Sequence, residues 1–254
     1  NGLEASWLNN YQESMKKLGY PQRVIDKIVV NPKPEDLTED CIPVYLENRS
    51  TRKLGEYTLS GKYDFIAEGK VEDLKTTSTY TYVNNTKEED YILQGSIYRW
   101  LNPDIITADT IAIQYVFMNW SAGQVKIVNN YPPNQVMKVE YPLMSLEETE
   151  TYIKNKLDNL SKYLHADEPT IPHCSDKELW RSDPSWKYYK NPEKTNRSTK
   201  NFTNELEALE RLHKDGSVGI VKHVPGQVRA CKYCSGITVC TQKDALIADG
   251  SLIL

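Results

Sequence analysis

Two aspartates and a lysine follow one another closely in the sequence, in the order Asp64, Asp73, Lys75. Carboxylate oxygens are the ligands that Mg²⁺ and Mn²⁺ prefer. A metal ion held by two carboxylates lowers the pKa of a bound water and neutralises charge on a phosphate group. A lysine beside it can orient the attacking water or stabilise the transition state. These residue types therefore indicate a divalent-metal phosphodiesterase site, with Asp64 and Asp73 as metal ligands.

A hairpin is needed to bring these three residues together. Residues 57–66 and 70–76 both alternate in polarity like strands, and a Glu-Gly pair between them predicts a turn. Side chains of a strand repeat every two residues, so Asp73 and Lys75 should share one face. A tight turn brings Asp64 close to that pair. The alternative interpretation is two solvated acids on an edge hairpin.

The order of these residues resembles the D…(D/E)xK signature of the PD-(D/E)xK nuclease superfamily. The segment 88–101, which predicts a helix, contains Gln94-Gly95-Ser96-Ile97-Tyr98 and resembles the QxxxY motif of the RecB-like branch. That branch includes the Cas4 nucleases and many phage exonucleases. The resemblance implies a restriction-endonuclease-like α/β core, in which helices flank a mixed central sheet. It also implies that Gln94 and Tyr98, on one helix face, border the metal site and position the DNA.

The resemblance implies a further metal ligand, a histidine or glutamate, on a helix ahead of the hairpin. The predicted helix 3–18 offers only Glu4 at its start, and no histidine precedes His165. The alternative role for Glu4 is a favourable charge in the first turn of the helix. The chain begins at Asn1, so we expect further residues upstream, and these could supply a histidine.

Three of the five cysteines form a Cys-x2-Cys-x5-Cys pattern, Cys231, Cys234 and Cys240. An odd number of cysteines does not favour a disulfide framework. Close thiolates with one distant partner indicate either a 4Fe–4S cluster or a tetrahedral zinc site. The pattern resembles the iron–sulfur staple of Cas4 and related helicase-nucleases, which favours the cluster. The remaining alternative is a set of free buried thiols.

Two cysteines compete for the role of fourth ligand. Cys41 precedes the nuclease motifs, as the distant cysteine does in several of the resembling families. The segment around Cys174 resembles the cysteine-bearing C-terminal part of phage members of the superfamily. We therefore predict Cys174 as the fourth ligand.

Segment 186–201 combines five basic residues with one acid and interleaved aromatic rings. Cations for phosphates and aromatic faces for bases are typical of a path for single-stranded DNA, and the alternative is a solvated loop. Hydroxyl groups just beyond Lys75 are further candidates for phosphate contacts. The predicted DNA-binding residues are Thr76, Thr77, Ser78, Arg99, Trp186, Lys187, Tyr189, Lys190, Lys194 and Arg197.

Composition sets the wider limits. The chain has 254 residues, 39% of them hydrophobic, and a net charge of −4. These values predict a soluble globular protein whose DNA contacts come from a local patch. No apolar stretch predicts a membrane span or a secretory segment, so we expect a cytoplasmic protein without membrane partners. We predict a nuclease core over residues 1–168 and a packed cysteine lobe over residues 169–254.

Other elements follow from periodicity and breakers. The predicted helices cover residues 3–18, 22–30, 88–101, 145–164 and 203–214, and the predicted strands cover residues 42–47, 57–66, 70–76, 109–118, 124–128, 136–141 and 218–224. The resemblance implies metal-dependent DNA hydrolysis, exonucleolytic on single strands or duplex ends, in phage replication or recombination. The alternative function is a DNA-binding subunit that keeps the nuclease-like fold with little or no activity. A purely structural phage protein would leave both motifs unexplained.

Overall fold

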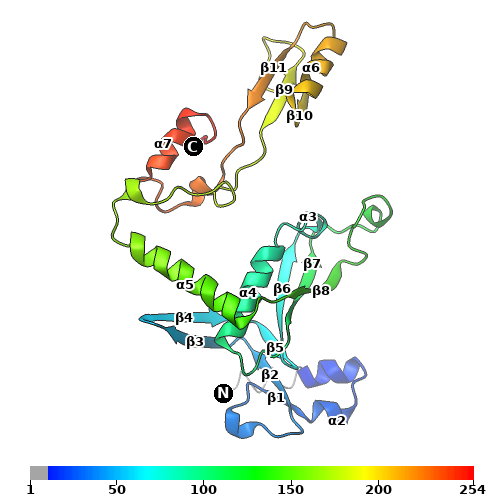
Figure 1. The fold of residues 1–254 in the computed structure, drawn as a ribbon. Helices are drawn as coiled ribbons and strands as arrows, with labels where there is room; N and C mark the ends of the chain where they lie inside the picture. The colour runs from blue at the N-terminus through cyan, green and yellow to red at the C-terminus, as the bar shows by residue number, and fades with distance from the viewer. Residues whose placement is uncertain (1–10) are drawn as a thin grey trace. The chain divides into compact units, whose positions relative to one another are not determined.

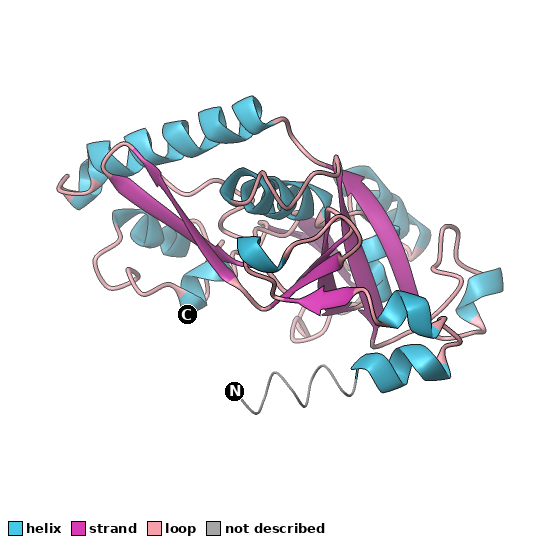
Figure 2. Ribbon diagram, turned by 90° about the horizontal axis from the view of Figure 1, so that it is seen from below, coloured by secondary structure: helices cyan, strands magenta, loops and turns pink. Residues whose placement is uncertain are grey.

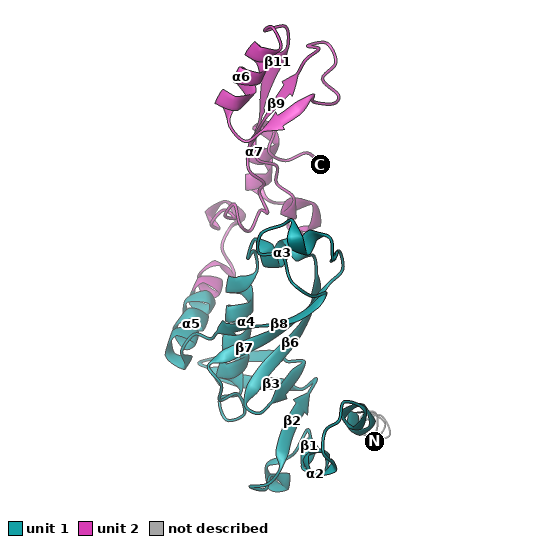
Figure 3. Ribbon diagram, turned by 90° about the vertical axis from the view of Figure 1, so that its right-hand side faces the viewer, with its two compact units in different colours: residues 1–158 teal, residues 159–254 magenta. Residues whose placement is uncertain are grey.

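The computed structural model describes residues 11–254. The chain forms two compact units, residues 1–158 and residues 159–254 (Figure 3). The division falls inside helix α5 (Leu146–Tyr163), ahead of the boundary that the sequence predicts after residue 168. Each unit has its own sheet and its own hydrophobic core.

Unit 1 is built on a six-stranded mixed sheet in the order β1-β2-β5-β6-β7-β8 (Figure 1). Its strands are β1 (Ile28–Val30), β2 (Ile42–Leu46), β5 (Phe65–Ala67), β6 (Lys70–Thr77), β7 (Thr110–Phe117) and β8 (Val136–Pro142). The pairs β1–β2 and β6–β7 are parallel, and the other pairs are antiparallel. Strands β3 (Arg49–Leu54) and β4 (Tyr57–Lys62) form a separate antiparallel ribbon. The predicted mixed α/β architecture is therefore confirmed.

Helix α4 (Glu88–Leu101) is the crossover that joins the parallel strands β6 and β7, as a parallel pair requires. Its ends agree with the predicted segment 88–101. Tyr91 packs edge-on against Tyr115 of β7, with 6.0 Å between ring centroids, and lies beside Tyr141 of β8. Strand β7 buries Ile111, Ala112, Ile113, Tyr115 and Phe117, which agrees with the mainly apolar sequence there. These contacts fix α4 over the sheet next to β6.

The remaining described helical segments of unit 1 are short, apart from α5. They are residues 11–17, α2 (Gln22–Ile25), η1 (Pro34–Asp36), α3 (Thr79–Val83) and η2 (Gln124–Lys126). Figure 2 shows the helices and strands in separate colours. Helix α5 begins with the predicted capping box, in which the Ser145 and Glu148 side chains each accept the other's backbone N–H, at 3.1 and 2.8 Å. None of the helices within residues 11–254 combines the length and apolar character that a bilayer crossing requires.

Three sequence-based predictions for unit 1 are wrong. The helix over 22–30 ends at Ile25, and the β-branched residues that follow form β1 against β2. Residues 124–126 form a 3-10 turn instead of part of a strand. The strand over 57–66 breaks at Tyr63 and Asp64, because β4 pairs with β3 whereas β5 pairs with β2 and β6.

Gly95 lets α4 approach the sheet closely. A Cβ at this position would lie 2.7 Å from Cδ2 of Leu143 and 2.8 Å from Cβ of Ile111, which is fully buried in β7. Gly95→Ala should therefore lower the free energy of unfolding by about 1–3 kcal/mol through overpacking, despite the higher helix propensity of alanine. Thermal unfolding followed by circular dichroism measures this effect. Gly123→Ala is the control, since the nearest atom to its new Cβ is 3.9 Å away; equal melting temperatures for the two variants would contradict the prediction.

Unit 2 contains a three-stranded antiparallel sheet in the order β10-β9-β11. Its strands are β9 (Ser185–Tyr189), β10 (Lys200–Phe202) and β11 (Ile220–Val224), and α6 (Glu205–Lys214) packs on one face through a core that includes Tyr188, Phe202 and Ala208. The rest of the unit contains η3 (Glu168–Thr170), η4 (Ala230–Tyr233) and α7 (Thr241–Ala248). Leu179, Val228, Leu246 and Leu252 form a second, small core there, with Cys231 packed against it.

Candidate active site

Four of the predicted catalytic residues meet between β6 and α4. Asp73 of β6 is only 3% exposed, and its Oδ2 lies 2.6 Å from Nζ of Lys75. Gln94 of α4 donates from Nε2 to Asp73 Oδ1 at 2.9 Å, and the same nitrogen lies 3.1 Å from the Tyr98 hydroxyl. Tyr98 donates in turn to the carbonyl of Lys62 at 2.8 Å. The two-residue repeat of β6 and the four-residue spacing on α4 thus converge on one carboxylate.

Asp64 lies beside this network in the break between β4 and β5. Its side chain is exposed, and its negative charge contributes to raising the pKa of Asp73. The turn at Glu68 and Gly69 joins β5 to β6 as predicted, with both residues in the left-handed region (φ 50° and 74°). The structure therefore places the two predicted metal ligands close enough to interact, one buried and one accessible to solvent.

Burial is the largest influence on Asp73 and raises the pKa of its carboxyl group. The Lys75 ammonium and the Gln94 amide act in the opposite direction, and the charge of Asp64 adds to the rise. Asp73 Oδ2 receives no well-aligned hydrogen bond from any described residue, although the Lys75 ammonium lies close to it. A buried oxygen with unused acceptor capacity next to a second carboxylate suits a hard divalent cation.

The carboxylate set is small. Within residues 11–254, no three side chains of the His, Cys, Asp or Glu types are arranged to hold a metal ion. Asp64 and Asp73 are thus the donors that the described site offers. Glu4, the third predicted ligand, lies outside the described residues.

A groove of about 410 Å³ adjoins the network. It lies between β4 and α4, and both Gln94 and Tyr98 line it together with Asp90 and Lys62. The full lining is Ser60, Gly61, Lys62, Asp90, Leu93, Gln94, Ile97 and Tyr98. The glutamine and tyrosine of the motif therefore form the boundary between an open groove and the buried carboxylate of Asp73.

The hydroxyl cluster after Lys75 differs in accessibility along its length. Thr76 is exposed, whereas Thr77 is half-buried and shares a 2.9 Å hydrogen bond with Thr81. Ser78 is half-buried at the N-cap of α3, and its side chain makes no capping hydrogen bond. Thr76 is the most accessible of the three for a phosphate contact.

The predicted phosphate contact of Arg99 is wrong. Its guanidinium is buried, where Nη1 lies 2.7 Å from Asp109 Oδ1 and Nη2 donates to the Met144 carbonyl. These bonds tie α4 to the residues that precede β7 and α5. Arg99 therefore stabilises the unit instead of meeting DNA.

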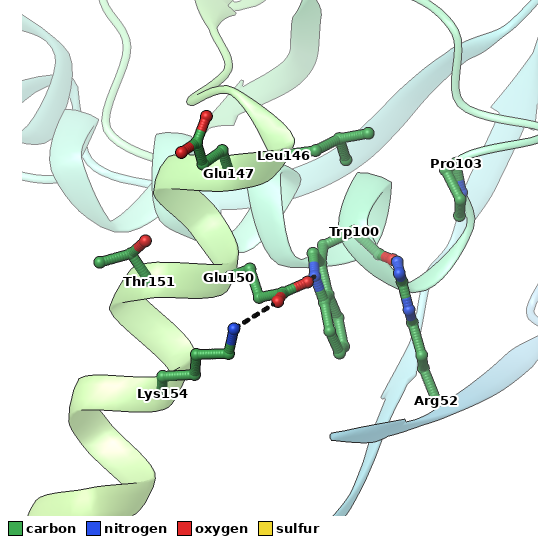
Figure 4. Close-up of a pocket in the computed structure, with 8 residues that line it drawn as sticks. All are labelled: Arg52, Trp100, Pro103, Leu146, Glu147, Glu150, Thr151 and Lys154. Carbon is green, nitrogen blue, oxygen red and sulfur yellow. Dashed lines mark hydrogen bonds and ion pairs between the residues drawn. The ribbon is translucent and has the colours of Figure 1, made fainter. Parts of the chain in front are cut away.

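A second hollow, of about 450 Å³, lies between β3, the end of α4 and the start of α5 (Figure 4). The Arg52 guanidinium sits 4.3 Å from the centre of the Trp100 ring, and Trp100 Nε1 donates to Glu150 at 3.2 Å. Glu150 also pairs with Lys154 at 2.7 Å. The polar groups of Arg52, Trp100, Glu150 and Lys154 are thus paired with one another. No predicted catalytic residue lines the hollow. It forms a structural joint between α4 and α5.

Four of the five cysteines gather in unit 2. Burial raises the pKa of the Cys174 thiol, and Glu178, Cys240, Cys234 and Cys231 raise it further. Burial also raises the pKa of Cys231, and the nearby thiols of Cys240 and Cys234 raise the pKa of Cys231 further. Cys174 and Cys234 are exposed, and Cys231 and Cys240 are half-buried. Cys41 lies in unit 1, where its sulfur accepts from the Thr38 backbone at 3.4 Å.

A glutamine that sequence reasoning missed holds the distant cysteine in place. Gln242 of α7 accepts from the backbone N–H of Cys174 and donates to its carbonyl, both at 2.9 Å. Cys240 is the N-cap residue of the same helix, and Cys234 ends η4. The thiols are not arranged as a closed ligand set among the described residues, but four soft sulfur donors suit zinc or an iron–sulfur cluster. The only sequence signal for Gln242 was its position two residues after Cys240.

The segment 186–201 keeps its cations accessible but not its tyrosines. Lys190, Lys194 and Arg197 are exposed, and Lys187 is half-buried on β9. Tyr189 is buried (7% exposed), so its predicted stacking on a base is wrong. The reason is that β9 is the central strand of the sheet, with β10 on one side and β11 on the other.

Trp186 is more accessible to solvent than the two buried tyrosines but less accessible than the exposed cations of the segment. Its ring is half-buried beside the α6 core and packs against His223, with 4.9 Å between ring centroids. Lys187, its neighbour on the other face of β9, pairs in register with Lys222 of β11. The accessible part of the segment is therefore cationic more than aromatic.

Comparisons with known proteins add little to this site. No protein-family model matches the chain, and no curated protein matches it. A solved structure described as "Crystal structure of SSO0001" aligns with 45% of this chain and 50% of that chain, at 15% sequence identity and a TM-score of 0.31. The alignment thus spans half of that chain, and similarity at this level supports no argument about function.

Proposed function

We propose that this protein is a Mg²⁺- or Mn²⁺-dependent deoxyribonuclease with a restriction-endonuclease-like core, acting on single strands or duplex ends. The observation that carries the proposal is the convergence of Lys75 and Gln94 on the buried carboxylate of Asp73, with Asp64 beside it. The order of these residues in the sequence also resembles the PD-(D/E)xK signature. The role in phage replication or recombination, in the host cytoplasm, rests on that resemblance alone.

Each residue has a distinct part in the proposed reaction. Asp64 and Asp73 would hold the divalent ion, which when bound supplies a water of lowered pKa and positive charge at the phosphate. Lys75, whose side chain is 28% exposed, orients the attacking water or stabilises negative charge on the phosphate. Gln94 fixes one oxygen of Asp73, and Tyr98 fixes Gln94. Such bonds hold a carboxylate in one orientation for its cation.

We propose that Cys174, Cys231, Cys234 and Cys240 hold a 4Fe–4S cluster, with structural zinc as the alternative. The support is the Cys-x2-Cys-x5-Cys spacing, the Gln242 bonds that hold Cys174 to the helix beginning after Cys240, and the packing of Cys231 against a core of only four buried side chains. A core of that size gains much from a staple that closes the loop between residues 174 and 231.

One observation favours a second function, a DNA-binding subunit with little or no activity. The described site offers two carboxylates and no third metal-binding side chain. Incubation of labelled single-stranded and double-stranded DNA with Mg²⁺ or Mn²⁺, with and without EDTA, separates the two functions. We expect cleavage that EDTA abolishes. Binding without cleavage would support the second function, and neither binding nor cleavage would contradict both.

A further inference from the structure

A groove of about 630 Å³ lies beside the cysteines of unit 2, on the surface of the small core there. The indole of Trp180 and the phenol of Tyr233 line it, and these residues are 59% and 80% exposed. Their ring centroids are 6.0 Å apart, with the planes tilted by 45°. We call this feature the Trp180–Tyr233 groove. Two large aromatic rings left in water at one groove are unusual for a folded surface.

The backbone holds Trp180 outward at a conformational cost. Its φ of 49° lies in the left-handed region, which is a strained conformation for a bulky residue. The preceding residue, Leu179, is buried in the small core, and its carbonyl accepts from the N–H groups of Arg229 and Ala230 at 3.1 and 3.2 Å. These bonds anchor the backbone at Leu179 while the indole stays exposed. Strain of this kind concentrates at binding sites.

The charges of the groove all have one sign. Arg229 and Lys232 are the two ionisable side chains in the lining besides Tyr233, and both are exposed. Among residues 11–254 neither of these cationic side chains forms a hydrogen bond or an ion pair that would neutralise it. No carboxylate side chain lines the groove. Free cations beside exposed rings match the two chemical parts of a single-stranded polynucleotide, its phosphates and its bases.

We propose that the Trp180–Tyr233 groove binds single-stranded DNA, with bases stacked on the two rings and phosphates held by Arg229 and Lys232. The choice of DNA rests on the proposed function. The groove has the accessible aromatic faces that segment 186–201 lacks, because Tyr188 and Tyr189 are buried there. In this proposal the bases therefore stack on Trp180 and Tyr233, and not on the aromatic rings of segment 186–201.

The groove is also linked to the cysteines by the sequence itself. Lys232 and Tyr233 are the two residues between Cys231 and Cys234, and they form the second half of η4. Any centre that binds those two thiols fixes the loop that presents one ring and one cation. The proposed cluster would therefore preorganise the DNA groove, which is a role beyond stabilising the fold.

The test measures binding of labelled oligo-dT to the full-length protein by fluorescence anisotropy in EDTA, so that no cleavage occurs. Trp180→Ala combined with Tyr233→Ala should raise the Kd by about tenfold to a hundredfold, the scale of removing one or two stacked bases. Trp180→Phe should keep the Kd within about threefold, since phenylalanine retains an aromatic face. Arg229→Gln with Lys232→Gln should flatten the salt dependence by about one unit of slope for each phosphate that the replaced cation neutralises.

Tyr20→Ala is the matched control, because Tyr20 is a 50% exposed tyrosine in unit 1. Circular dichroism and metal content of each variant establish that the fold is kept. Unchanged affinity in the double alanine variant, or equal loss in Tyr20→Ala, would overturn the proposal. Tighter binding to duplex DNA or to oligo-rU than to oligo-dT would overturn it as well. Absence of cleavage by the wild-type protein would contradict only the proposed nuclease activity, since this measurement does not depend on it.

Discussion

Asp73→Asn is expected to reduce metal-dependent DNA cleavage by at least about 10³-fold. The substitution replaces a buried negative oxygen by a neutral amide, and the loss of several kcal/mol of metal-held charge stabilisation corresponds to that factor. Rates of cleavage of labelled single-stranded DNA in Mg²⁺ or Mn²⁺ measure the effect. Lys75→Ala should be milder, at roughly 10²-fold, because it removes one electrostatic stabiliser and leaves both carboxylates in place.

Asp73→Asn should not weaken the fold. The pKa of Asp73 is raised by burial in the folded protein, so the folded state holds the proton more tightly than the unfolded state does. Ionised Asp73 therefore opposes folding, and this effect grows as the pH rises through the folded pKa. Asp73→Asn should keep or increase the melting temperature at neutral pH. Loss of cleavage together with an unfolded protein would leave the catalytic assignment unsupported.

Glu72→Gln is the control for the expected loss of cleavage in Asp73→Asn. Glu72 is the neighbour of Asp73 on β6, but its side chain lies on the other face, where it pairs with Lys138 and accepts from Gln114 at 2.8 Å. We expect cleavage at close to the wild-type rate. Wild-type cleavage by folded Asp73→Asn, or an equal loss in Glu72→Gln, would refute the site.

Cys231→Ala is expected to remove the bound centre of unit 2 and to destabilise residues 170–254. Anaerobically purified wild-type protein should be brown and contain about four irons per chain if the centre is a 4Fe–4S cluster. Cys174→Ala should give the same loss, because a four-ligand centre stabilises the fold only when its ligands are complete. Visible absorbance, iron content and limited proteolysis of the 170–254 region measure the two effects.

Cys41→Ala is the matched control, since Cys41 lies in unit 1 whereas the four predicted ligands lie in unit 2. It should keep both colour and stability. Full colour in Cys174→Ala together with loss in Cys41→Ala would contradict the choice of fourth ligand. Colourless protein with stoichiometric zinc would replace the cluster by the alternative metal and keep the four-cysteine assignment. Colourless protein without zinc would contradict the metal centre altogether.

The sequence was sufficient where local periodicity determines the structure. The alternation of residues 70–76 and the four-residue spacing of Gln94 and Tyr98 correctly predicted β6 and the inward face of α4. The turn before β6 follows from a Glu-Gly pair that tolerates the left-handed conformation. These elements place Asp73, Lys75 and Gln94, so the centre of the candidate site could be predicted without tertiary information.

The errors arose where tertiary partners decide the outcome. The alternation of polar and apolar residues continues through Tyr63 and Asp64. It cannot show that the chain pairs with β3 before this point and with β6 after it. A helical arginine reads as exposed until a partner such as Asp109 is known. Trp180 and Tyr233 are separated by 52 intervening residues of sequence, so no local pattern could indicate that their rings share a groove.

Helix α4 has a mechanical consequence for the protein. One turn of it carries Tyr98, which is bonded to the Lys62 carbonyl at the motif, and Trp100, which is bonded to Glu150 of α5. Arg99, between them, is bonded to the carbonyl of Met144 just ahead of α5. The start of α5 is thus fixed to the same turn of α4 that carries the motif tyrosine. The chain leaves unit 1 through α5, so the turn of α4 that carries Tyr98 also holds the start of the segment that leads to unit 2.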